Sequence, residues 1–122
     1  MPLAVCATPI GNLDDVTLRL LEELRSADLI LCEDTRHTRV LLDRHGIAGA
    51  TLLSYHEHNE AARASELVGR MREGAVVALV SDAGMPLVSD PGYLLVRGCV
   101  AAGLPVEVLP GPSAAITART AS

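Results

Sequence analysis

Five short stretches of the sequence combine polar or acidic side chains with turn-forming glycine and proline. They are TPIGNLDD (8–15), EDTRHT (33–38), HEHNE (56–60), SDAGMPLVSDPG (81–92) and PGPSA (110–114). Together they supply carboxylates, imidazoles and guanidinium groups, the side chains that transfer protons, hold metals or bind anions. Each stretch follows a short apolar run, so any shared chemistry depends on a fold that brings the ends of those runs together.

The stretch 81–92 is the hardest to explain as a simple connection. A strand-to-helix connection needs about two to six residues, whereas this one contains two consecutive turns. Asp82 could accept hydrogen bonds from an amine or a hydroxyl, and Ala83 and Gly84 leave room for a ligand against the backbone. In PGPSA, Gly111 and the free N–H groups of a helix start would suit an anion.

The first two stretches also have a purely structural interpretation. Asn12 or Asp14 could cap a helix after the first stretch, and Asp34 or Thr35 could cap a helix in the second. Both interpretations stay open at the level of sequence.

The histidine-rich stretch HEHNE raises the question of a metal site. His56 and His58 lie beside two carboxylates, but no third ligand follows at a known spacing. We therefore predict a polar loop that holds no metal.

Several well-known site motifs are missing. No G-x-G-x-x-G follows the first apolar run, no G-x-x-x-x-G-K-[ST] occurs, and the Ser, His and Asp residues form no nucleophile elbow. A small-residue pocket with one or two carboxylates remains, which suits a cofactor with apolar surface and an amino-acid or ribose end.

The elements that must position these stretches alternate regularly. Apolar, β-rich runs predict strands, and the segments between them carry helical patterns. The strands are expected at 3–7, 28–33, 51–55, 75–81 and 106–110, and the helices at 15–25, 36–44, 58–72 and 91–102. This alternation predicts an α/β fold, a doubly wound five-stranded parallel sheet with helices on both faces. All five stretches would then meet at the carboxyl edge of the sheet, where ligands bind.

Composition limits the class of protein. The length of 122 residues is typical of one domain. The net charge is −5, with ten Arg and no Lys, so the chain has no strongly basic surface for nucleic acid. Three cysteines without metal-type spacing predict reduced core residues of a cytoplasmic protein. No apolar stretch is long enough to span a bilayer, and MPLAVCATPIG lacks the basic region of a signal peptide. We therefore expect neither a membrane span nor a signal peptide.

The motifs, taken in order, resemble one family closely. TPIGNL, EDTRHT, HEHN, SDAGMPLVSDPG and PGPSAAITA are similar to the amino-terminal domain of the small-subunit ribosomal RNA cytidine 2′-O-methyltransferases, within the tetrapyrrole (corrin/porphyrin) methylase superfamily. The resemblance implies S-adenosylmethionine as methyl donor, ribosomal RNA as partner and a homodimer. It also implies that residues 1–122 are a first domain, because family members continue into a second α/β domain.

The resemblance also implies where the cofactor lies. Its walls would come from the loop after the first strand, the stretch after the fourth and the turn after the fifth. The residues are Pro9, Ile10, Gly11, Asp82, Ala83, Gly84, Met85, Pro112, Ser113 and Ala114.

A ribose 2′-hydroxyl is a weak nucleophile, so a base or strong acceptor would help methyl transfer. Asp34, Glu57, His56 and His58 would all face the same edge; we select Asp34 and His56 as candidate catalytic residues. Candidate substrate-binding residues are Arg36, His58 and Asn59, and Arg39 could join Arg36 in holding RNA phosphates. Two alternatives remain open: methylation of a tetrapyrrole precursor, and a non-catalytic module that binds a nucleotide-like ligand.

Overall fold

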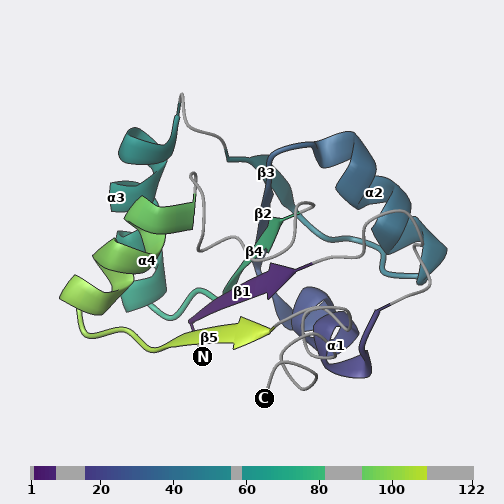
Figure 1. Ribbon diagram of the computed structural model, residues 1–122, viewed down its shortest axis with the longest axis horizontal. Helices are drawn as coiled ribbons and strands as arrows, with labels where there is room; N and C mark the ends of the chain where they lie inside the picture. The colour runs from purple at the N-terminus through teal and green to yellow at the C-terminus, as the bar shows by residue number, and fades with distance from the viewer. Residues whose placement is uncertain (1, 8–15, 56–58, 82–91, 110–122) are drawn as a thin grey trace, which may run out of the picture.

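A five-stranded parallel sheet forms the centre of the protein (Figure 1). The computed structural model describes residues 2–7, 16–55, 59–81 and 92–109. The strands pair in the order β3-β2-β4-β1-β5, and every pairing is parallel. They are β1 (Leu3–Ala7), β2 (Leu29–Cys32), β3 (Leu52–Ser54), β4 (Val77–Ser81) and β5 (Val106–Leu109). Each lies within the range predicted from its apolar run, so the predicted sheet is confirmed.

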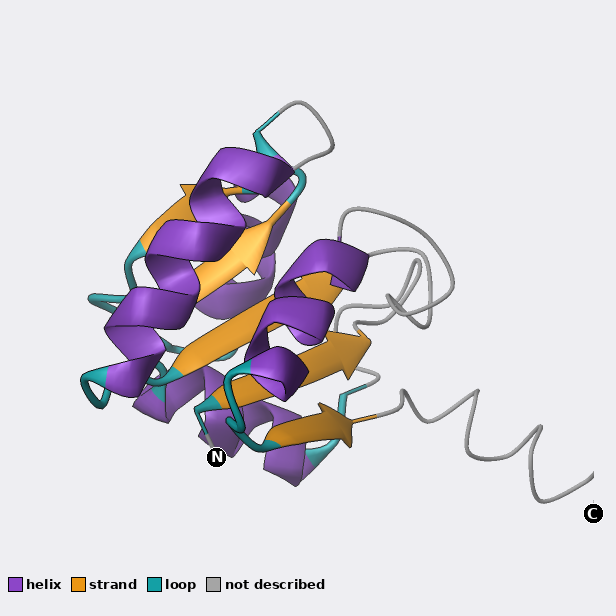
Figure 2. Ribbon diagram, turned by 90° about the vertical axis from the view of Figure 1, so that its left-hand side faces the viewer, coloured by secondary structure: helices purple, strands orange, loops and turns teal. Residues whose placement is uncertain are grey.

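Four helices cover the two faces of this sheet. They are α1 (Leu18–Ser26), α2 (Thr35–Arg44), α3 (Glu60–Arg72) and α4 (Gly92–Ala101). Helices α1 and α2 lie on one face and α3 and α4 on the other (Figures 1 and 2). The fold is therefore the predicted doubly wound α/β arrangement.

Alternation along the strands divides the buried side chains into two cores. In β1, Leu3 and Val5 belong to the core beneath α3 and α4, whereas Ala4 and Cys6 belong to the core beneath α1 and α2. Successive side chains of a strand point to opposite faces. A strand covered on both faces must therefore be apolar at every position, which is why the runs do not alternate with polar residues.

Two apolar residues in the predicted helical segments are exposed. Val40 in α2 is 54% exposed, and Leu94 in α4 is 38% exposed. Neighbouring helix residues differ by about 100° around the axis, so three consecutive apolar residues cannot all face one core. In α2 the core takes Leu41 and Leu42, and Val40 points away.

The structure shows which residues cap α1 and α2, which the sequence left open. The first helix begins at Leu18, and the Oγ1 of Thr17 accepts a hydrogen bond from the Leu20 N–H at 3.1 Å. The cap of α1 is therefore Thr17 rather than Asn12 or Asp14. The cap of α2 is Asp34, one of the two predicted residues.

The three cysteines are free and buried, as predicted. Burial, with smaller contributions from the charges of Glu23 and Glu107, raises the pKa of Cys6 to about 12, and burial also raises the pKa of Cys99. These two thiols stay protonated near neutral pH and act as small apolar side chains.

Among the described residues, no helix has the length and apolar character needed to cross a bilayer.

Candidate functional site

Three of the five chemistry-bearing stretches leave the sheet from neighbouring strands. The Cα atoms of Ala7 and Ser81, the last residues of β1 and β4, are partners in the sheet, and Cys6 is the partner of Leu109 at the end of β5. The chain therefore enters 8–15, 82–91 and 110–114 from adjacent positions on one edge. These are the three segments predicted to form the cofactor walls.

The connections diverge at this edge. Strand β4 leads to α4 on one face, whereas its neighbours β1 and β2 lead to α1 and α2 on the opposite face (Figure 1). In doubly wound sheets ligands bind in the crevice that forms where neighbouring connections run to opposite faces. The strand order therefore indicates the carboxyl end of β4, the central strand, as the candidate ligand site.

Many predicted site residues lie outside the part of the chain that the structure describes. They are Pro9, Ile10, Gly11, His56, His58, Asp82, Ala83, Gly84, Met85, Pro112, Ser113 and Ala114. For these residues the structure fixes only the strand ends from which their segments begin.

Asp34, a candidate catalytic residue, has a defined structural role. Its Oδ1 accepts hydrogen bonds from the backbone N–H groups of Arg36 at 2.9 Å and His37 at 3.3 Å, which caps α2. The guanidinium Nε of Arg36 lies 3.9 Å from the same oxygen, and the Asp34 side chain is 52% exposed. All three interactions use Oδ1.

The two candidate phosphate-binding arginines line one shallow hollow beside the β3 edge of the sheet. It has a volume of about 440 Å³ and is lined by Thr35, Arg36, Arg39 and Leu52. The Nη2 of Arg39 donates a hydrogen bond to the Ala50 carbonyl at 3.3 Å, whereas the Arg36 side chain is 95% exposed. Arg36 is therefore the more available of the two for an anion.

Asn59 has a structural contact that the sequence did not indicate. It directly precedes α3, and its Nδ2 donates a hydrogen bond to the Ser54 carbonyl at 3.2 Å. The amide thus links the residue before α3 to the last residue of β3. The predicted role of Asn59 in substrate binding would be additional to this contact.

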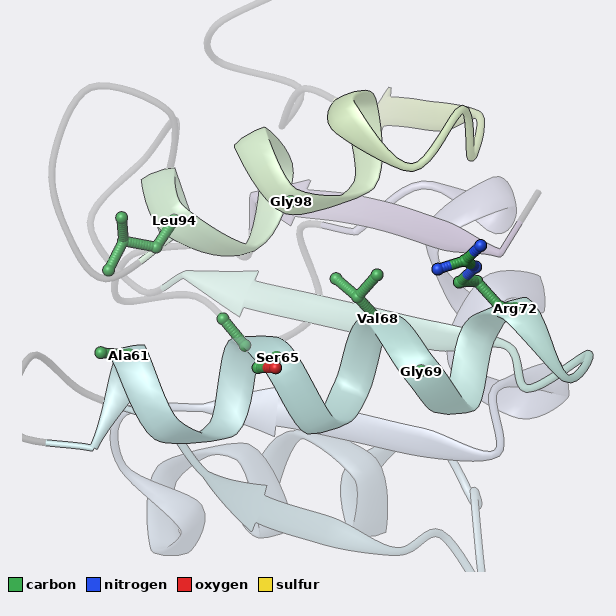
Figure 3. Close-up of a pocket in the computed structure, with 8 residues that line it drawn as sticks. Ala61, Ser65, Val68, Gly69, Arg72, Leu94 and Gly98 are labelled. Atoms are coloured by element: carbon green, nitrogen blue, oxygen red, sulfur yellow. The ribbon is translucent and has the colours of Figure 1, made fainter.

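A second hollow runs between α3 and α4 (Figure 3). Its volume is about 530 Å³, and its lining is Ala61, Ala64, Ser65, Val68, Gly69, Arg72, Leu94 and Gly98. Small residues allow the close approach: a Cβ added at Gly98 would lie 3.0 Å from the Val68 Cγ2. Among the described residues that line this hollow, Arg72 is the one ionisable side chain, so they offer no acid–base pair.

Metal binding gains no support among the described residues, which contain no group of three or more His, Cys, Asp or Glu side chains placed to hold an ion. If the full-length protein transfers a methyl group, as the motif resemblance implies, we expect that activity to survive dialysis against a strong chelator, with no stoichiometric metal in the purified protein. Elemental analysis and activity before and after chelation test this. One zinc per chain, lost together with activity, would contradict it.

The fold and the arrangement of its strand ends define a class of protein. A uroporphyrin-III-C-methyltransferase from Thermus thermophilus superposes with a TM-score of 0.68 at 27% identity, covering 89% of this chain and 46% of that chain. The sequence profile of the family Tetrapyrrole (Corrin/Porphyrin) Methylases matches residues 2–122. The chain therefore belongs to the tetrapyrrole methylase family, as its motifs predicted.

Within the family, the chain is similar to proteins named ribosomal RNA small subunit methyltransferase I. It is 55% identical over 120 residues to that protein of Escherichia coli O157:H7, covering 98% of this chain and 42% of the relative. It is 51% identical over 120 residues to that of Thermotoga maritima, covering 98% of this chain and 54% of the relative. The chain thus spans about half the length of these relatives.

Proposed function

We propose that this chain is the first domain of an enzyme that uses S-adenosylmethionine to methylate a ribose 2′-hydroxyl in small-subunit ribosomal RNA. The observation that carries the proposal is the adjacency of the β4, β1 and β5 ends. The three predicted cofactor segments thus begin side by side at one edge of the sheet, next to the point where the connections of β4 and its neighbours diverge. The similarity to small-subunit ribosomal RNA methyltransferases supports the choice of substrate.

The residue types of these segments fit the proposed cofactor, which when bound would supply an electrophilic sulfonium methyl group. Asp82 would accept hydrogen bonds from the amino or hydroxyl groups of such a ligand. Ala83 and Gly84 have little or no side chain, so they would let the ligand lie close to the backbone. Ile10 would provide apolar contact. Because methyl transfer is an in-line displacement, positioning by these walls would supply much of the catalysis.

The substrate would approach from the ends of β2 and β3. Asp34 caps α2 two residues after the end of β2, and its Oδ2 makes none of the capping contacts. That oxygen would accept the proton or hydrogen bond of the ribose hydroxyl, with His56 as a second candidate. Arg36 would bind a phosphate of the same RNA strand.

A second domain would complete the site. The curated relatives are about twice as long as this chain, which covers 42% and 54% of two of them. We propose that the remainder closes the cofactor crevice and supplies the positive charge that RNA requires, since this domain carries a net charge of −5. Such an enzyme would act in the cytoplasm, where ribosomal subunits mature.

The decisive experiment incubates the full-length protein with methyl-labelled S-adenosylmethionine and either unmodified small ribosomal subunits or a tetrapyrrole precursor. We expect label in the RNA, retained in a single 2′-O-methylated nucleoside after nuclease digestion. Label in the tetrapyrrole would redirect the proposal to that substrate class. Label in neither would favour a ligand-binding module without catalysis.

We further propose that the full-length protein is a homodimer that uses the exposed side of α4. Tyr93 and Val100 are 54% and 66% exposed, and their spacing of seven places them on one side of the helix. Val100→Glu should weaken self-association about tenfold or more, because a charge would enter an apolar contact. Val40→Glu, which alters a similarly exposed valine on α2, is the matched control. Light scattering over a dilution series measures both, and a monomeric parent protein would contradict the proposal.

A further inference from the structure

Glu60 is a buried acid at the junction of two helices. It is the first residue of α3 and is 3% exposed, and among the described residues no other carboxylate is classed as buried. Its Oε1 accepts a hydrogen bond from the backbone N–H of Leu94 at 2.9 Å. Since carboxylates are rarely buried without a purpose or a partner, this contact needs an explanation.

The contact acts as a cap supplied from outside the helix. Leu94 is the third residue of α4, and the first N–H groups of a helix have no partner within it. In many helices the residue before the first turn provides an acceptor for these groups; the Leu94 N–H instead has an acceptor on another helix. Glu60 takes over this role while its charge lies at the positive N-terminal ends of both helices.

A third element lies within range of the charge of the same carboxylate. Tyr55 follows β3, is fully buried, and donates its backbone N–H to the Cys32 carbonyl at 2.9 Å. Burial first, and the charge of Glu60 second, raise the pKa of the Tyr55 phenol. The charge of Glu60 therefore acts on the residue that follows β3, while its carboxylate joins the starts of α3 and α4.

This position connects two stretches that are distant in sequence. The chain enters α3 from the HEHNE stretch and enters α4 from residues 82–91, the proposed central wall of the cofactor site. We propose that Glu60 is a positioning residue that fixes the start of α4, and with it the carboxyl-terminal end of the cofactor segment, relative to the substrate-facing edge. The inference rests on the proposed function, because it assigns Glu60 to S-adenosylmethionine binding.

Three substitutions separate the hydrogen bond from the charge. Glu60→Gln keeps an acceptor at the same reach and loses the charge. Glu60→Asp keeps the charge but is one methylene shorter, so it cannot reach the Leu94 N–H from a fixed helix start. Glu60→Ala loses both. Glu66→Ala changes an exposed acid on the same helix and is the matched control.

The readouts are the dissociation constant for S-adenosylmethionine, measured by calorimetry, and KM and kcat for methyl transfer, all in the full-length protein. We expect Glu60→Ala and Glu60→Asp to raise both the dissociation constant and KM about tenfold or more, because a hydrogen bond to a charged group is lost. At saturating cofactor, kcat should change by less than about twofold. Glu60→Gln and Glu66→Ala should stay within about threefold of the parent.

Each other outcome overturns the proposal. A lower kcat at unchanged KM would mean that the variants merely contain less folded enzyme. Parent-like cofactor binding by Glu60→Asp, or a loss in Glu60→Gln as large as in Glu60→Ala, would show that the hydrogen bond is not what matters. If Glu60→Ala does not fold, Glu60→Asp carries the same test. A parent protein that binds no S-adenosylmethionine would instead remove the proposed function, and this inference with it.

Discussion

Replacing Gly84 by valine should abolish binding of S-adenosylmethionine to the full-length protein while leaving the protein folded. Gly84 lies outside the described residues, but its segment begins at Ser81, beside the ends of β1 and β2, where the connections diverge. If Gly84 lines the cofactor site as proposed, a branched side chain there would occupy cofactor space, and it would add strain wherever the backbone needs a conformation that favours glycine. Steric overlap and strain together should weaken binding about 100-fold or more.

Gly69→Val is the matched control for that experiment. Gly69 lies in α3, where an added Cβ meets no atom within 4 Å, so the same substitution should leave cofactor affinity unchanged. Titration calorimetry compares the two variants, and circular dichroism checks that both are folded. Undiminished affinity in Gly84→Val would remove residues 82–85 from the proposed cofactor site.

The sequence predicted the sheet and its helices because burial on two faces leaves a strong signal. A strand such as AVVALV (75–80) has no polar position, since one set of its side chains packs under α3 and α4 and the other under α1 and α2. The strand order was not accessible in this way. It depends on which strands pair across the whole chain, and it is this order that brings the ends of β4, β1 and β5 together.

The polar contacts of the site were harder to predict. Glu60 resembles an ordinary solvated acid in the first turn of a helix, and only the packing of α4 onto α3 buries it. Asn59 was interpreted as substrate-binding, but its contact with the Ser54 carbonyl depends on the return of the chain from β3. Asp34 was predicted both as a cap and as a catalytic residue; the cap is confirmed, and the catalytic role stays a prediction.

Asp34→Asn should therefore separate the two roles of this residue. Asparagine caps helices about as well as aspartate, so its side-chain oxygen should keep the bonds to the Arg36 and His37 N–H groups. The free energy of unfolding should change by less than about 0.5 kcal/mol. If the second carboxylate oxygen accepts the proton of the ribose hydroxyl, kcat should fall about 10²- to 10⁴-fold, the usual contribution of a general base.

Asp34→Ala provides the contrast, because it removes the cap as well as the charge. It should destabilise the protein by about 1 kcal/mol and show the same loss of kcat as Asp34→Asn. Single-turnover methyl transfer with saturating S-adenosylmethionine and RNA measures the chemical step, and denaturant unfolding measures the cap. If Asp34→Asn has the same turnover as the parent protein, and Asp34→Ala alone is less stable, then Asp34 acts only as a helix cap. The proton acceptor would then have to come from the HEHNE stretch, where His56 is the next candidate, since that stretch begins at the end of β3, the neighbour of β2.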